Sequence, residues 1–103
     1  MKDKILNQGE LERLSEIYKS FANVPRLKIL IRLQDKECTA GELSAAAGLS
    51  QSATSHQLKE LKFYRIIKSR KEGLNVYYSL DDDHIVKLLK NGIKHISQED
   101  CDD

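Results

Sequence analysis

Two histidines near the C-terminus, His84 and His95, are candidate ligands for a metal ion. Both lie in residues 82–99, where apolar side chains recur with helical spacing after a run of aspartates, so we expect an amphipathic helix. Eleven residues make three turns plus about 20°, which places both imidazoles on one side of that helix. They are roughly 16 Å apart along its axis, and one ion with ligands at about 2 Å cannot touch both.

Two copies of this helix packed antiparallel would remove the obstacle, because His84 of one chain would face His95 of the other. Asp82, together with Gln98 or Glu99 one turn beyond His95, could complete a four-ligand site, twice per dimer. The structural alternative is that both histidines lie at the edge of the apolar arc, where amphipathic side chains often extend to solvent. Spacing alone leaves both interpretations open.

A second set of polar side chains, within residues 51–56, could contact DNA. Gly48-Leu49-Ser50 is typical of the turn in a helix-turn-helix, with a glycine that tolerates positive φ and a serine that caps the next helix. We expect that helix from Gln51 to about Phe63. Hydrogen-bonding side chains at its start suit base edges in a major groove, although serines are also simply favourable at helix starts. The candidate DNA contacts are Gln51, Ser52, Ser55 and His56.

The period of the sequence changes to two after this helix. Residues 66–71 and 75–80 are predicted strands, joined by a turn that contains Gly73. Three cations, Lys68, Arg70 and Lys71, make the hairpin basic. A basic hairpin after a recognition helix is a wing, which brings its cations to DNA phosphates in or beside the minor groove.

The preceding segments should position these side chains. Residues 1–8 are expected to fray, and an apolar stripe predicts a helix from Gly9 to about Phe21. Pro25 suits the first turn of a second, buried helix through Leu33. Thr39 with Glu42 forms a predicted capping box for a short third helix through Ala47.

Length and composition are those of one reduced, cytoplasmic domain. The chain has 103 residues and two cysteines, too few for a disulfide framework, and no run of apolar residues approaches membrane-spanning length. Lys and Arg outnumber Asp and Glu by six to three in residues 42–80, whereas residues 81–103 carry three against seven. A basic middle favours a polyanion partner and an acidic end favours cations. No motif of an enzyme nucleophile or phosphate-binding loop is present, so we expect no enzyme. We assign the domain to residues 9–98 and an acidic tail to residues 99–103.

Four sequence blocks in this order resemble the ArsR/SmtB family of bacterial metal-responsive repressors. They are Asn-Val-Pro-Arg-Leu-Lys-Ile-Leu (23–30), Gly-Glu-Leu (41–43), Leu-Ser-Gln-Ser-Ala-Thr-Ser-His-Gln-Leu-Lys-Glu-Leu (49–61) and Val-Tyr-Tyr-Ser-Leu (76–80). The resemblance spans about residues 10–98. It implies a mainly α winged helix-turn-helix of order α-α-α-α-β-β-α with a small hairpin, which forms a homodimer through the first and last helices. It also implies operator binding in the metal-free state and release on metal binding.

Members of this family hold metal at one of two places. One class uses cysteines at the start of the helix before the recognition helix. The matching positions here are Thr39 and Gly41, and Cys38 lies one residue too early, so the resemblance implies that this thiolate site is missing.

The other class uses the last helix, with Asp-x-His near its start and His-x-x-His or His-x-x-Glu eleven residues later. Asp82, His84 and His95 match that pattern, while its fourth position falls on Gln98, for which Glu99 or water could substitute. Oxygen and imidazole ligands favour Zn²⁺, with Co²⁺ and Ni²⁺ as competitors, over copper(I), cadmium or lead. Because imidazole must be neutral to bind, affinity should fall below about pH 6.5.

Two other functions are compatible with these residues. A winged-helix repressor could sense redox or reactive sulfur chemistry through Cys38 and Cys101, without a metal. A winged helix could also be a protein-interaction module that contacts no DNA, in which case its binding would be insensitive to salt.

Overall fold

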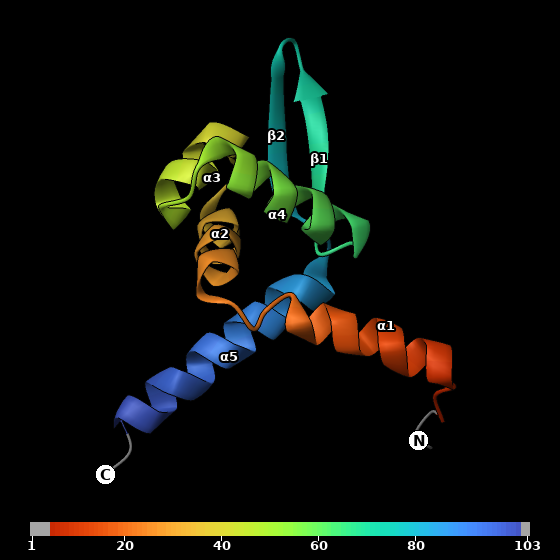
Figure 1. Ribbon diagram of the computed structural model, residues 1–103. Helices are drawn as coiled ribbons and strands as arrows, with labels where there is room; N and C mark the ends of the chain where they lie inside the picture. The colour runs from red at the N-terminus through yellow and green to blue at the C-terminus, as the bar shows by residue number, and fades with distance from the viewer. Residues whose placement is uncertain (1–4, 102–103) are drawn as a thin grey trace.

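The computed structural model describes the backbone of residues 5–101 and the side chains of residues 5–97. Four helices are followed by a two-stranded hairpin and a fifth helix, which confirms the predicted order and the winged helix-turn-helix fold (Figure 1). The elements are α1 (Gln8–Lys19), α2 (Val24–Asp35), α3 (Ala40–Ala47), α4 (Gln51–Phe63), β1 (Ile67–Glu72), β2 (Asn75–Leu80) and α5 (Asp83–Cys101).

Each of the first four helices begins at a side chain that caps it. The four caps are Asn7, Asn23, Thr39 and Ser50. The predicted capping box is present: Thr39 N donates to Glu42 Oε1 (2.8 Å), and Glu42 N donates to Thr39 Oγ1 (3.3 Å). Helix α1 begins at Gln8, one residue earlier than expected, because Asn7 and Glu10 form a second capping box.

The core lies where α2, α3 and α4 meet the hairpin and the start of α5. Ile29, Leu43, Leu61 and Ile66 are each 0% exposed. Helix α5 adds Ile85 and Leu89 to the same cluster, whereas α1 has no buried residue and contributes only partly buried side chains. In Figure 1, α1 and α5 diverge on one side of the molecule, and the hairpin projects on the opposite side.

The hairpin is antiparallel, with Ile67 opposite Leu80 and Glu72 opposite Asn75. Its two-residue turn contains Gly73 at φ 62°, a left-handed conformation that favours glycine. The connection between α2 and α3 joins the hairpin through a backbone bridge, in which Cys38 N donates to Tyr78 O (3.1 Å) and Tyr78 N donates to Cys38 O (2.7 Å). This bridge fixes the base of the hairpin to the start of α3.

Helix α5 begins and ends slightly later than the sequence indicates. Asp82 precedes the helix and accepts a hydrogen bond from Ile85 N at 3.1 Å. The helix continues to Cys101, so the first three residues of the expected tail, 99–101, are helical. Among residues 5–101, no helix is long and apolar enough to cross a membrane.

Replacing Leu61 by alanine tests the packing of α4. Its side chain is fully buried, so Leu61→Ala should lower the free energy of unfolding by about 2–5 kcal/mol in urea denaturation. Leu74→Ala is the matched control, because Leu74 is 99% exposed in the hairpin turn and should change stability by less than about 0.5 kcal/mol. Equal losses in the two variants would contradict this description of the core.

Candidate nucleic-acid interface and candidate metal ligands

The turn between α3 and α4 is built as the sequence predicts. Gly48 has φ 68°, and the turn is closed by Leu49 N, which donates to Ser44 O at 3.1 Å. The buried Ser44 hydroxyl donates to Leu49 O at 2.6 Å. Ser50 caps α4 by accepting from Ala53 N at 3.1 Å. These bonds set the direction in which α4 leaves the turn.

Helix α4 has one buried and one exposed face. Thr54, Leu58 and Leu61 face the core, and the Thr54 hydroxyl is satisfied by Ser50 O at 2.9 Å. The four predicted DNA contacts lie on the exposed face, in the first two turns: Gln51, Ser52, Ser55 and His56. Their hydrogen-bonding groups can therefore meet an external partner, with the helix backbone held rigidly behind them.

Arg26, at the start of α2, holds α4 through two contacts that the sequence analysis missed. Its guanidinium donates to Gln57 Oε1 and pairs with Glu60 Oε1. The other carboxylate oxygen of Glu60 lies 3.7 Å from His56 Nε2. His56 is thus connected through Glu60 to a second helix. No local pattern could reveal these contacts, because α2 and α4 are distant in the sequence.

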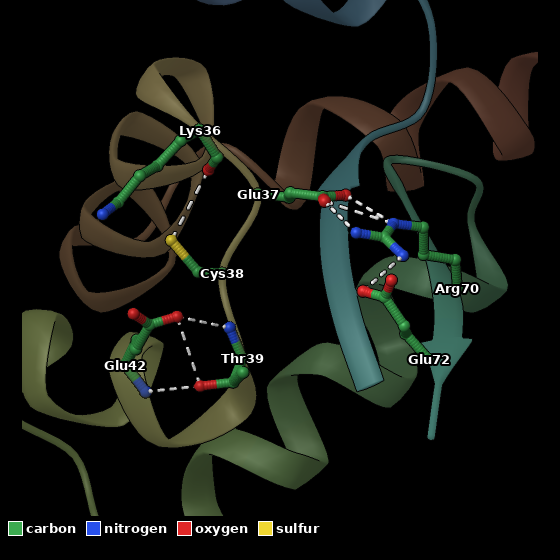
Figure 2. Close-up of polar contacts among 7 residues, drawn as sticks. All are labelled: Lys36, Glu37, Cys38, Thr39, Glu42, Arg70 and Glu72. Atoms are coloured by element: carbon green, nitrogen blue, oxygen red, sulfur yellow. Dashed lines mark hydrogen bonds and ion pairs between the residues drawn. The ribbon is translucent and has the colours of Figure 1, made fainter. Parts of the chain in front are cut away.

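The three predicted cations of the hairpin have different surroundings. Lys68 and Lys71 are exposed and have no ion-pair partner within residues 5–97. Arg70 instead donates from Nε to both carboxylate oxygens of Glu37 (3.1 and 3.0 Å), and its Nη1 lies 3.3 Å from Glu72 Oε1 (Figure 2). The bonds from Arg70 lower the pKa of Glu37 below its usual value, and the two carboxylates raise the pKa of Arg70.

The predicted metal ligands are only partly brought together within one chain. His84 Nδ1 lies 3.5 Å from Asp82 Oδ2, and both side chains are exposed. The hydrogen bond from Ile85 N, helped by His84, lowers the pKa of the Asp82 carboxyl. His95 lies eleven residues further along α5, about 16 Å at 1.5 Å per residue. Within the described part of a single chain, no three His, Cys, Asp or Glu side chains form a cluster that could hold a metal.

The remaining predicted ligands and the second cysteine are at the end of α5. The side chains of Gln98, Glu99 and Cys101 lie outside the described residues. Cys38 is 0% exposed, and its burial raises the pKa of its thiol. A buried thiol with a raised pKa is a poor nucleophile and a poor metal ligand, so this geometry does not favour sensing through Cys38.

Apolar side chains remain uncovered on α1 and α5. An open groove between α1, α2 and α5 is lined mainly by apolar side chains, including Tyr18, Phe21, Leu88 and Ile93. The exposed apolar residues of these two helices are Leu11, Leu14, Tyr18, Ile93 and Ile96. A surface of this kind is typical of a protein interface.

Comparison with known proteins identifies the family of this arrangement. The family model described as "Bacterial regulatory protein, arsR family" matches residues 23–69. A transcriptional repressor SmtB homolog of Synechocystis sp. is 33% identical over 97 residues, which cover 94% of this chain and 74% of that protein. A cadmium resistance transcriptional regulatory protein CadC homolog of Staphylococcus aureus is 33% identical, over 80% of this chain and 69% of that protein.

Solved structures show the same fold. The homodimeric winged helix-turn-helix DNA-binding domain of Mb0332 from Mycobacterium bovis, a possible ArsR-family transcriptional regulator, superimposes with a TM-score of 0.84. The alignment covers 96% of this chain and 93% of that one, at 23% sequence identity. At this identity the likeness bears on the fold alone.

Removing the cap of α4 should loosen the face that carries the polar side chains. Ser50→Ala loses the hydrogen bond to Ala53 N and should cost about 1 kcal/mol of unfolding free energy, measured by urea denaturation. Ser55→Ala is the matched control, because Ser55 is exposed and caps no helix, and its effect should stay within about 0.5 kcal/mol. A cost for Ser55→Ala as large as that for Ser50→Ala would refute the assigned cap.

Proposed function

The chain belongs to the ArsR/SmtB family of bacterial transcriptional regulators, and we propose that it is a metal-sensing repressor that binds operator DNA as a homodimer. It is a DNA-binding winged-helix regulator rather than an enzyme. The observation that carries the proposal is the separation of two surfaces. In Figure 1, the start of α4 and the hairpin lie away from α1 and the outer part of α5. The apolar groove is lined by residues of α1, α2 and α5, and of the two histidines His84 lies at the start of α5 and His95 further along it.

In the proposed complex, the start of α4 reads the major groove. Gln51 can pair with a base through both the oxygen and the nitrogen of its side-chain amide, while Ser52, Ser55 and His56 supply further hydrogen bonds to base edges or phosphates. Lys68 and Lys71 of the hairpin bring positive charge to the neighbouring phosphates. These contacts are accessible because all of the side chains involved are exposed.

The proposed homodimer forms through α1 and α5. Tyr18 is 54% exposed and Ile96 is 59% exposed in the single chain. Burying these apolar side chains in a dimer interface would stabilise the dimer. A twofold axis would cover the apolar faces of both helices at once. We propose residues 9–98 as the functional domain.

The proposed metal site lies between the two α5 helices. Asp82 and His84 already point toward each other, and they would hold the ion together with His95 of the partner subunit and one further ligand, Gln98 or Glu99. A carboxylate and two imidazoles suit Zn²⁺ best, with Co²⁺ or Ni²⁺ as competitors. The cadmium-resistance relative supports metal sensing in general. The bound ion would act as an effector that links the two subunits.

A link between the α5 helices would act on DNA binding through the core. Ile85 and Leu89 of α5 pack in the same cluster as Leu58 and Leu61 of α4. A change in how the two α5 helices cross would therefore change the relation between the two α4 helices, which must reach major grooves about 34 Å apart. Couplings of about 1–3 kcal/mol are typical, and DNA must weaken metal binding by the same factor.

Substitution of Gln51 tests the DNA-reading surface. Gln51→Ala should weaken binding to the DNA upstream of the chain's own gene by about 1–3 kcal/mol, measured by fluorescence anisotropy, because a bidentate base contact is lost. Gln8→Ala, the same change at the exposed start of α1, should leave the affinity unchanged. If Gln51→Ala binds that DNA as tightly as the unaltered protein, α4 does not read bases at this position.

Substitution of the histidines tests the metal effector. Zinc should weaken DNA binding of the unaltered protein by about 5–150-fold, and His84→Ala and His95→Ala should each remove that response while preserving metal-free binding. His56→Ala is the control, since His56 lies on α4 and should leave the zinc response intact. Anisotropy titrations with and without zinc measure both effects. If zinc releases His84→Ala from DNA at the same zinc concentration that releases the unaltered protein, the proposed site is ruled out.

A further inference from the structure

The side chain of Arg70 is occupied by contacts within the protein. Nε and Nη2 donate to the carboxylate of Glu37, Nη1 faces Glu72, and the guanidinium carbon lies 4.8 Å from the centre of the Tyr77 ring. A guanidinium that meets one carboxylate with two nitrogens forms the most specific of the ion-pair geometries. Glu37 and Glu72, which Figure 2 shows around Arg70, and the ring of Tyr77 together fix the direction of this side chain.

Glu37 occupies the place where the connection between α2 and α3 meets the hairpin. The next residue, Cys38, forms the backbone bridge with Tyr78, and Thr39 caps α3. Tyr78 follows Tyr77, which lies directly opposite Arg70 in the strand register. The ion pair between Glu37 and Arg70 thus adds a side-chain connection next to the backbone one, and both join the hairpin to the helix-turn-helix.

The charges around Arg70 argue against a phosphate contact. One guanidinium faces two carboxylates, so this cluster carries a net charge of −1 rather than +1. A phosphate would have to displace Glu37 and would still lie near two negative side chains. Lys68 and Lys71 have no such competitors among residues 5–97, and their ammonium groups are exposed.

We propose that Arg70 is a positioning residue, which holds the hairpin against the α2–α3 connection through Glu37, and that the phosphate contacts of the hairpin come from Lys68 and Lys71. This inference rests on the proposed DNA-binding function. It assigns the three neighbouring cations, which the sequence presents as one basic group, to two different tasks. It also gives Glu37, an acidic residue on a DNA-binding domain, a positive contribution to DNA binding.

The salt dependence of DNA binding separates the two tasks. Each phosphate contact contributes about 0.9 to the slope of log affinity against log salt, so losing one in each wing of a dimer should flatten the slope by about 2. We expect this flattening in Lys71→Gln. Arg70→Gln removes the same charge, but we expect it to lower the DNA affinity by one constant factor at all salt concentrations. The slope of log affinity against log salt should therefore not change. A slope that flattens as much in Arg70→Gln as in Lys71→Gln would overturn the proposal.

Hydrogen exchange tests the positioning role without DNA. Arg70→Gln and Glu37→Gln should each speed amide exchange in residues 67–80 by about two- to fivefold, because an exposed ion pair of good geometry is worth that factor. Lys71→Gln should leave the rates unchanged, and circular dichroism should show that all three variants are folded. Unchanged exchange in both Arg70→Gln and Glu37→Gln would reject the positioning role. If the unaltered protein binds no DNA at any salt concentration, the proposed function fails, and the exchange rates still decide what Arg70 does.

Discussion

The burial of one face of α4 is the constraint on which the rest of this structure depends. Leu58 and Leu61 can leave water only if α4 lies against its neighbours, chiefly α3 and β1, and the polar Thr54 joins them because Ser50 O accepts its hydrogen bond. With that face committed, the opposite face must remain at the surface. The turn at Gly48 and the contacts of Arg26 with Gln57 and Glu60 then hold the exposed face in one orientation. The surface that we propose reads DNA is in this sense a consequence of how the core is packed.

The parts of the structure that the sequence predicted are those encoded by neighbouring residues. Two predicted features are present as expected: the capping box formed by Thr39 and Glu42, and the turn at Gly48. Each involves residues that are only a few positions apart. The faces of α4 followed from its periodicity for the same reason. The predicted helix boundaries were less accurate. Helix α1 begins earlier than expected because Asn7 forms a capping box with Glu10, which the pattern of apolar residues does not indicate.

The contacts that the sequence could not predict join distant segments. Arginine is a residue type that often binds phosphate, and only the fold shows that Arg70 forms an ion pair with Glu37. The backbone bridge between Cys38 and Tyr78 could not be predicted either, because it joins two residues that are far apart in the sequence. The candidate metal site has a related limit. One chain brings Asp82 and His84 together, but His95 can join them only through a second chain. The histidine spacing suggested that second chain, and the family resemblance implied the homodimer.

The backbone bridge at Cys38 has a consequence for the DNA that this protein would bind. Because it joins the base of the hairpin to the start of α3, the hairpin cannot swing independently of the helix-turn-helix. Each subunit of the proposed dimer therefore meets the duplex as an inflexible arm. Two such arms demand one fixed spacing between the half-sites of an operator, because even a whole extra helical repeat, which keeps the rotational phase, would move one half-site by about 34 Å.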